Sequence, residues 1–289
     1  MNISGGRVGK VSVLSTGMVD IHPEHAEDSG QPMAWWILTS RRWLNDRPIN
    51  VYVIEHADGL VLFDTGQDRA SVTDADYYPK FPLRLAYERL AKFHVSEEQT
   101  FARQLSSLGY SPGDVRTVVI SHLHQDHIGG LADLTGAEIV VSAKEWETLT
   151  KPFPETRGVL RRHIDRPGLN WNRVTFTPTD DPQIRPFTSC YDLMGDGSLL
   201  LLPTPGHTPG SVSLLVKREP HPLLLVGDLM FSGDILEAGK ISGVGDRGHL
   251  RDSSDKVLQM KRNRPDLAIL AAHDPAAARQ LEEAVGPPA

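Results

Sequence analysis

Four residues able to bind a metal ion lie within six positions of this chain, in residues 121–130. That stretch reads Ser-His-Leu-His-Gln-Asp-His-Ile-Gly-Gly, and its candidate ligands are His122, His124, Asp126 and His127. Neutral imidazoles and a carboxylate are the ligands that Zn²⁺ and similar cations prefer. Without a cation, three histidines and an aspartate would crowd polar groups together beside the end of a strand. We therefore predict a metal site here rather than a set of ordinary polar side chains.

The segments on either side of this stretch predict how it is held. Residues 115–120 read Val-Arg-Thr-Val-Val-Ile, which is rich in β-branched residues and typical of a strand. Gly129 and Gly130 follow as a turn signal. A loop at the end of a buried strand can aim several side chains at one point while the strand keeps the loop rigid.

Further candidate ligands also follow predicted strands. Residues 51–54 and 60–63 flank an Asp-Gly pair and predict a hairpin, which Asp64 follows. Strands are also predicted at residues 198–202, 211–217, 222–226 and 267–271. His207 follows the first of these, Asp228 the third and His273 the last. Ligands gather at such strand ends in layered α/β folds.

Together these motifs resemble those of the metallo-β-lactamase superfamily. The chain carries His-x-His-x-Asp-His at 122–127, Phe-Asp-Thr-Gly at 63–66, Thr-Pro-Gly-His-Thr-Pro-Gly at 204–210, Gly-Asp at 227–228 and Ala-His-Asp at 272–274. Their order and spacing are most similar to the N-acyl-homoserine lactonase branch. The resemblance implies an α/β fold, an αββα four-layer sandwich. We expect residues 1–289 to form a single such domain with an insertion at about 67–94. The strands fall into two groups, before and after about residue 150, as a duplicated unit requires.

The resemblance also implies two adjacent metal sites. His122, His124 and His207 hold one ion, Asp126, His127 and His273 hold the other, and Asp228 bridges them. Asp64 is expected to orient the ligand histidines from behind. The expected cofactors are two divalent metal ions, first of all Zn, although Mn, Co and Fe accept the same ligands.

Such a site predicts hydrolysis. A metal-bound water ionises near neutral pH, and the second metal stabilises the leaving oxygen, so no protein nucleophile is needed. Asp126 can accept and return a proton. We expect a dinuclear hydrolase that opens a lactone such as an N-acyl-homoserine lactone by metal-bound hydroxide, a quorum-quenching activity.

One residue departs from the lactonase pattern. Phe231 lies three positions after Asp228, where the lactonases carry a tyrosine whose hydroxyl contacts the substrate. Loss of one such donor can cost roughly 10²–10³ in rate. The alternative is therefore hydrolysis of another ester or thioester, as in glyoxalase II, and the third hypothesis is a metal-binding module without turnover. His124 stands where diiron oxidoreductases of the superfamily carry Glu, and the full set of seven ligands speaks against an iron dioxygenase.

Two segments are candidates for the substrate pocket. Residues 16–43 are predicted to be irregular, and their Met18, Trp35 and Trp36 either form a pocket wall or cover the core. His22 and His25 in the same segment lie outside the ligand motifs and are expected at the surface. The aromatic insertion at 67–94, with a helix near 83–92, is a partner surface, a substrate lid or ordinary packing.

Three helices and one charged run complete the chain. A capping box at 96–99 predicts a helix to about residue 108, and another at 142–145 opens a second helix. A third helix is expected from residue 253 to about 262. His163 lies among Arg161, Arg162 and Arg166, where a solvated face is favoured over an anion site.

Composition limits the remaining function classes. The 289 residues carry a net charge of −7, which speaks against nucleic-acid binding. Cys190 is the one cysteine, so no intrachain disulfide can form, and a structural role is expected for it. Residues 1–10 contain no signal-peptide core, and no segment predicts a membrane span. We expect a cytoplasmic protein that acts on a small lactone or ester. The sequence leaves the choice between a monomer and a homodimer undecided.

Overall fold

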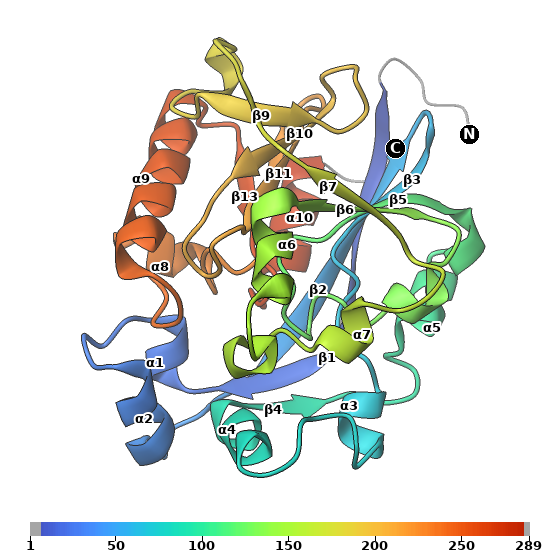
Figure 1. Ribbon diagram of the computed structural model, residues 1–289. Coiled ribbons are helices and arrows are strands. Elements are labelled where there is room, and N and C mark those ends of the chain that lie inside the picture. The colour runs from blue at the N-terminus through green and yellow to red at the C-terminus, as the bar shows by residue number, and fades with distance from the viewer. Residues whose placement is uncertain (1–6, 286–289) are drawn as a thin grey trace.

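The computed structural model describes residues 7–285, which form two β-sheets packed face to face with helices on the outer faces (Figure 1). Most of the 1–10 stretch discussed above therefore lies outside the described residues. The first sheet has the strand order β4-β1-β2-β3-β5-β6-β7 and the second the order β13-β12-β11-β10-β9-β8. The strands are β1 Val8–Ile21, β2 Leu44–His56, β3 Gly59–Phe63, β4 Ala91–His94, β5 Val115–Val119, β6 Glu138–Ser142, β7 Asn170–Val174, β8 Thr177–Pro178, β9 Ser189–Asp192, β10 Leu199–Pro203, β11 Val212–Val216, β12 Leu223–Leu225 and β13 Ala268–Leu270.

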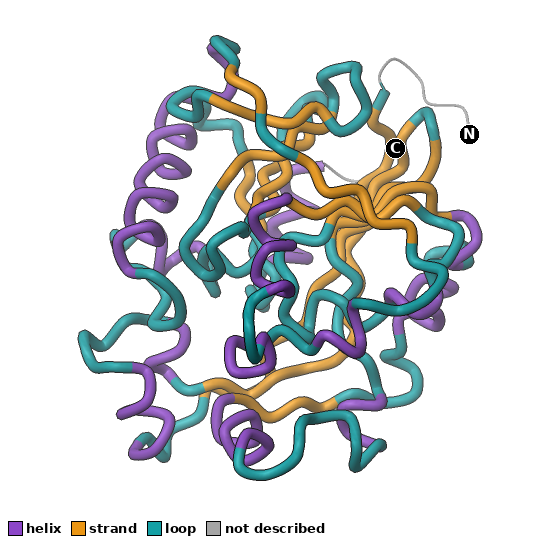
Figure 2. Tube along the Cα trace, in the orientation of Figure 1, coloured by secondary structure: helices purple, strands orange, loops and turns teal. Residues whose placement is uncertain are grey.

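Most of the helices lie on the outside of the two sheets (Figure 2). They are α1 Pro23–Ala26, α2 Met33–Thr39, α3 Ala70–Thr73, α4 Leu83–Leu90, α5 Phe101–Ser107, α6 Ala143–Thr150, α7 Arg161–Ile164, α8 Gly233–Glu237, α9 Arg247–Asn263 and α10 Ala277–Val285. Short 3₁₀ turns are η1 Pro112–Asp114, η2 Leu131–Asp133, η3 Pro154–Arg157 and η4 Pro182–Ile184. Helix α10 contacts both β1 and β13 and so covers an edge between the sheets.

The four-layer sandwich follows from the two-residue period of the strands. In β10, Leu199 and Leu201 point into the core between the sheets, whereas Leu200 and Leu202 point into the core under α8 and α9. Strand β3 likewise divides its residues between the central core and the core under α5 and α6. Strands buried on both faces read as continuous apolar runs, which is why alternation is hidden in the sequence. The predicted αββα fold is confirmed.

The structure corrects several predicted boundaries. Strand β1 continues to Ile21, into the stretch 16–43 that was predicted to be irregular, because it pairs with β2 on one side and β4 on the other. Residues 67–94, the predicted insertion, therefore supply the edge strand β4 as well as α3 and α4. Strand β7 belongs to the first sheet, so the two groups of strands separate after Val174 and not near residue 150.

Two predicted helix starts were also wrong. Residues 96–99 form a turn in which the backbone N–H of Ser96 donates to Gln99 Oε1 at 3.0 Å, and helix α5 begins only after Thr100. Helix α9 begins well before residue 253, because the side chain of Asp246 accepts from the backbone N–H of His249 at 2.9 Å and caps it. The second capping box opens α6 as predicted, with Ser142 accepting from the N–H of Glu145.

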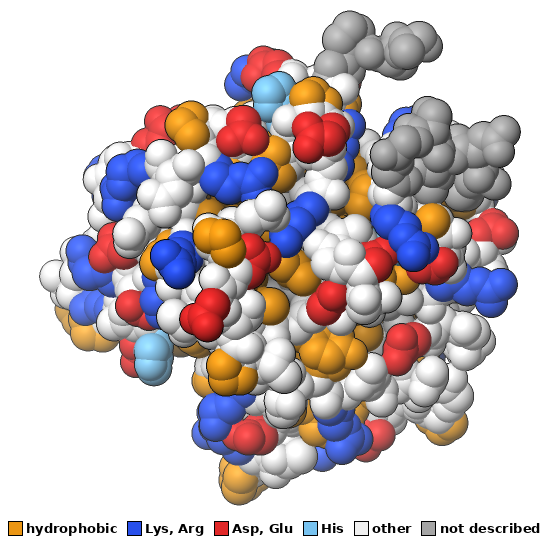
Figure 3. Space-filling model, turned by 90° about the horizontal axis from the view of Figure 1, so that it is seen from above, with side chains coloured by type: hydrophobic (Ala, Val, Ile, Leu, Met, Phe, Trp, Pro, Cys, Tyr) orange, Lys and Arg blue, Asp and Glu red, His pale blue; other side chains and the backbone are white. Residues whose placement is uncertain are grey.

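The surface mixes both signs of charge. Acidic and basic side chains are interspersed over the face seen in Figure 3, with apolar side chains between them. Among residues 7–285, no helix combines the length and the apolar composition needed to cross a lipid bilayer.

Candidate metal centre

The loop after β5 is held by the turn after β3. These strands run parallel, so their carboxyl ends meet at the same edge of the sheet. Thr65 donates from both its backbone N–H and its hydroxyl to the carbonyl of His127, at 2.8 and 2.9 Å. Gly129 packs so closely on this turn that a Cβ there would lie 2.1 Å from the backbone nitrogen of Asp68. Glycine at this position lets the two loops touch.

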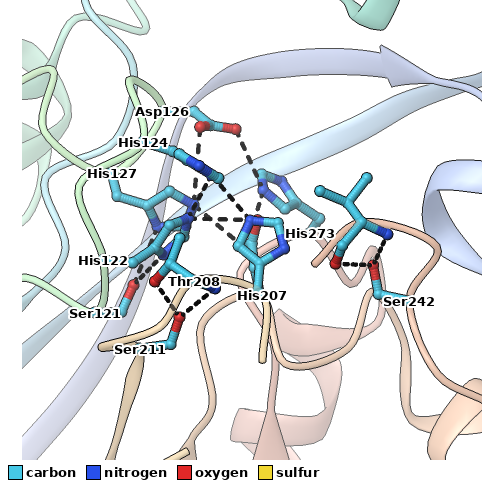
Figure 4. A network of polar contacts seen from close by, with 12 residues as sticks. Ser121, His122, His124, Asp126, His127, His207, Thr208, Ser211, Ser242 and His273 are labelled. Atoms are coloured by element: carbon cyan, nitrogen blue, oxygen red, sulfur yellow. Dashed lines mark hydrogen bonds and ion pairs between the residues drawn. The ribbon is translucent and has the colours of Figure 1, made fainter. Parts of the chain in front are cut away.

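The seven predicted ligands converge from both sheets (Figure 4). In the first group, Nδ1 of His124 lies 3.0 Å from Nε2 of His122 and 2.9 Å from Nε2 of His207. His207 comes from the loop after β10, so this group joins the two sheets. In the second group, Nε2 of His273 lies 3.5 Å from Oδ2 of Asp126, and Nε2 of His127 lies 3.9 Å from Oδ1 of the same carboxylate.

Asp228 lies between the two groups with one oxygen toward each. Its Oδ1 is 3.3 Å from Nε2 of both His127 and His273. Its Oδ2 is 3.5 Å from Nε2 of His207 and 4.0 Å from Nε2 of His122. The side chain follows β12 and is buried. Each oxygen is thus placed to complete one of the two groups.

The donor set fits divalent cations. Nε2 of His127 and Oδ1 of Asp228 are buried without a hydrogen-bond partner among the described residues, although they face the centre of the cluster. Nε2 of His124 lies 3.0 Å from the carbonyl of Arg157 and so carries the proton, which leaves the lone pair of Nδ1 facing two other imidazoles. Converging lone pairs repel one another unless a cation lies between them.

Burial sets the protonation of the cluster. Desolvation lowers the pKa of His122 and of His207 well below the ordinary value, so both imidazoles are neutral near pH 7. Desolvation alone would raise the pKa of Asp228, but His273 and His127 hold it well below the ordinary value, and the carboxylate in turn raises the pKa of both histidines against their desolvation. The neutral imidazoles of His122 and His207 and the ionised carboxylate of Asp228 are forms that bind metals.

Asp64 orients histidines of both groups. Its Oδ2 accepts from Nδ1 of His127 at 2.8 Å and from the hydroxyl of Ser121 at 2.8 Å, and the same hydroxyl lies 3.0 Å from Nδ1 of His122. Its Oδ1 accepts from the backbone N–H of Ser121 at 2.7 Å. The contact to His127 is the carboxylate–histidine arrangement that aligns metal ligands. Sequence reasoning did not single out Ser121, which had no motif of its own.

Glu145 joins the two ligand loops by hydrogen bonds, whereas the sequence predicts for it only a place in a capping box. Its side chain is fully buried. Oε1 accepts from the backbone N–H of Leu123 at 2.9 Å, between two ligand histidines. Oε2 accepts from the hydroxyl of Thr208 at 2.6 Å and the N–H of Gly210 at 3.1 Å, beside His207. The carboxylate therefore fixes the distance between loops from different sheets.

A cavity of about 990 Å³ opens above the cluster. Its floor includes Asp126 and Asp228. One wall is apolar and comes from the amino-terminal segment and residues 67–94, through Val19, Ile21, Met33, Leu90 and Phe93. Phe231, from the loop after β12, completes it. Lys151, Arg157, Arg247 and His249 lie at other parts of the lining.

The structure places the predicted pocket residues beside this wall and not in it. Met18, Trp35 and Trp36 are absent from the lining, whereas their neighbours Val19 and Met33 belong to it. Alternation along β1 turns Met18 away from the face that carries Val19 and Ile21. Trp35 is 61% exposed, and Trp36 is buried against His22 and His25.

Two histidines expected at the surface are buried. His22 lies under Trp43, and its Nδ1 and Nε2 are each 2.8 Å from a backbone carbonyl, of Arg42 and Arg89. His25 lines the cavity. Both face inward because residues 22–43 fold back over the site instead of forming a surface loop.

The charged run and the insertion pack on each other. His163 is half-buried, stacks on Tyr77 at 4.2 Å and lies away from the ligands. Tyr77 and Tyr87 are buried, and the hydroxyl of Tyr87 donates to the carbonyl of Glu155 at 2.7 Å. Phe81 remains 81% exposed. Most of the aromatic residues of the insertion thus pack internally or form the cavity wall.

Comparison with known proteins identifies the class. The metallo-beta-lactamase superfamily matches residues 44–273, and this chain belongs to it. The ligand cluster, the fold and the relatives make it a metal-dependent hydrolase of that superfamily.

Several of the similar proteins are named lactonases, and others are named only as hydrolases. The chain is 30% identical to the N-acyl homoserine lactonase AttM of Rhizobium radiobacter, over 82% of this chain and 86% of the relative. It is 30% identical to a probable metallo-hydrolase of Mycobacterium bovis, over 78% and 74%. A solved N-acyl homoserine lactone hydrolase with N-hexanoyl-L-homoserine bound superposes with a TM-score of 0.74 at 23% identity, covering 93% of this chain and 95% of that one. The dizinc lactonase AidC superposes with a TM-score of 0.61 at 18% identity, over 96% and 93%.

Glu145→Gln should loosen the metal centre. The amide would turn a donor toward groups that are themselves donors, which costs about 1–3 kcal/mol of folding free energy for each unsatisfied partner. Metal affinity should also fall about 10–100-fold, as for other changes behind a ligand. Chemical denaturation and metal titration measure the two effects. Glu147→Gln, on the exposed side of the same helix, is the matched control. Equal effects of the two variants would contradict the role given to Glu145.

Asp228→Ala should remove bound metal and hydrolytic activity, whereas His163→Ala should retain both. Asp228 is the only carboxylate of the cluster that faces both groups of imidazoles, and His163 contacts Tyr77 instead. Elemental analysis and kcat/KM, with circular dichroism to check folding, compare the variants. Similar losses in both would show that the ligand assignment is wrong.

Proposed function

We propose that this protein is a dinuclear metal-dependent lactonase that opens the ring of N-acyl-homoserine lactones. The observation that carries the proposal is the pairing of each Asp228 oxygen with a different group of ligands on the floor of a cavity with an apolar wall. Several relatives are named N-acyl homoserine lactonases. An apolar wall beside a polar floor suits a substrate that has both an acyl chain and a hydrolysable ring.

Two divalent cations, Zn²⁺ first of all, held by the seven ligands would supply Lewis acidity and a water acidic enough to ionise near neutral pH. The chain's own residues do the rest. Asp64 and Glu145 hold the ligand side chains and their loops in position through their hydrogen bonds. The apolar wall orients the acyl chain and excludes bulk water from the floor.

Asp126 is the residue placed to move the proton. It lies on the cavity lining and is less buried than Asp228, and its two oxygens lie 3.9 Å from Nε2 of His127 and 3.5 Å from Nε2 of His273. A carboxylate in this position can accept a proton from the attacking water and return it to the leaving ring oxygen. Ring opening then leaves a free hydroxyl and a carboxylate on one product.

Hydrolysis of another ester or thioester is the second candidate, and Phe231 is the observation that favours it. Phe231 is buried, stacks on His273 at 5.4 Å and packs with Val19 and Ile21. The cavity wall beside the second group is therefore apolar at this point and offers no hydroxyl to the substrate.

Metal content and substrate turnover test the proposal together. Protein purified without chelator should contain about two metal ions per chain, because seven ligands are too many for one tetrahedral zinc. The loaded protein should hydrolyse N-acyl-homoserine lactones faster than alkyl esters or glutathione thioesters. A stoichiometry of one under saturating zinc would refute the dinuclear site. Faster turnover of the thioesters would favour the second candidate, and metal without any turnover would refute both.

Phe231→Tyr should raise kcat for lactones, by at most the 10²–10³ or so that one charge-stabilising donor supplies. The two side chains differ by one oxygen, so the ring packing on His273 is kept. Steady-state kinetics and thermal unfolding are measured on the same preparation. Slower turnover with lower thermal stability would show that the added hydroxyl is buried without a partner. It would then count against a lactone as the natural substrate.

A further inference from the structure

His25 is a polar side chain in the apolar wall that the metal centre does not use. Its ring contacts Phe231 edge-on at 5.1 Å, and Phe231 stacks in turn on the ligand His273 at 5.4 Å. Trp36 lies on another side of the ring, at 5.9 Å. The imidazole is therefore one aromatic ring away from the second group of ligands, and it lines the same cavity.

The backbone of His25 is fixed by the loop that precedes α9. Its carbonyl accepts from the hydroxyl of Ser242 and from the N–H of Gly243, both at 3.0 Å. Gly243 approaches so closely that a Cβ there would lie 1.9 Å from the carbonyl oxygen of Glu24. A side chain held in this way is preorganised and loses little entropy when a ligand binds.

The ring itself is not satisfied by the protein. Nδ1 is buried and has no hydrogen-bond partner within the described residues. Burial lowers the pKa of His25 to about 4, so the ring is neutral at physiological pH and carries a single N–H. If Nδ1 carried the proton, its N–H would be buried without an acceptor, which costs more than an unprotonated nitrogen that accepts no hydrogen bond. The proton is therefore favoured on Nε2. The one donor of the ring is then available at the cavity.

We propose that His25 donates a hydrogen bond from Nε2 to a carbonyl oxygen of the substrate that lies beyond the bond being cleaved. This inference rests on the lactonase function proposed above and names the feature of the substrate that the wall recognises. The ring of Phe231 packs against both His25 and the ligand His273. We therefore assign the acceptor to the acyl side of the scissile bond, where an N-acyl-homoserine lactone has its amide carbonyl.

The proposal makes His25 a specificity residue for acylated lactones. A γ-lactone with a plain alkyl chain would fill the same apolar wall and offer His25 no acceptor. When the alkyl lactone binds, the N–H of His25 is left buried without an acceptor. This cost weakens binding of the alkyl lactone relative to the acylated one. Phe231, Val19 and Ile21 would hold either chain equally well.

The test compares two substrates in two variants. N-Hexanoyl-homoserine lactone and a γ-alkyl-γ-butyrolactone of equal chain length are given to metal-loaded wild type, His25→Phe and His25→Gln. His25→Phe should weaken binding of the acylated lactone about three- to tenfold, the usual worth of one neutral hydrogen bond, and leave the alkyl lactone unchanged. His25→Gln, which restores an N–H near the position of Nε2, should recover part of the loss. Product affinity for N-hexanoyl-homoserine, measured by calorimetry, should follow the same order.

Equal changes for both substrates, or no change for either, would overturn the role of His25. His94→Phe, at an exposed histidine of β4 that does not belong to the cavity lining, is the control and should affect neither comparison. A measurement on the wild type covers the case in which His25→Phe does not fold. The ¹⁵N resonance of His25 Nε2 should shift when N-hexanoyl-homoserine is added and stay unchanged with the ring-opened alkyl lactone, and the same shift with both would overturn the proposal. If the wild type hydrolyses neither lactone, the lactonase function itself fails.

Discussion

The structure depends on one buried carboxylate, Asp228, which faces two groups of imidazoles at once. A buried charge is costly unless it is paired, and here each oxygen has its own set of partners. The partners come from both sheets, so the two halves of the sandwich must meet at one edge for the charge to be satisfied. Cations at this site would complete the pairing and link the two sheets, and the metal centre is therefore part of the fold as well as its chemistry.

Two further buried carboxylates hold the candidate ligands in place from behind. Asp64 aligns histidines of both groups, directly for His127 and through Ser121 for His122. Glu145 joins the loop after β5 to the loop after β10. Each accepts hydrogen bonds from several donors, which compensates its desolvation. The ligands are consequently held by side chains that never touch the reacting atoms, and a change in either would act through geometry.

The apolar cavity wall comes largely from the end of β1, the segment that follows it and residues 67–94. Strand β1 extends to Ile21, and β4 pairs with its last residues, 18–21. The result is an apolar surface above the ligand cluster. Phe231 adds to it a ring without a polar group, and His25 adds a ring whose polar atoms the protein leaves unused. The candidate ligands and the apolar wall thus come largely from different segments of the chain.

The sequence by itself determined the candidate ligands, the core strands and the class of fold. His122, Asp126 and their neighbours are recognisable because a short motif brings together imidazoles and a carboxylate that would repel or lack partners without a cation, and apolar runs of five or six residues mark buried strands. Tertiary structure alone decided which side chains line the cavity. Met18 and Trp35 turn away from the cavity, His25 turns into it, and Glu145 serves two loops instead of its own helix. These roles depend on long-range pairing, such as that of β1 with β4, and no local period in the sequence encodes the direction in which a side chain then points.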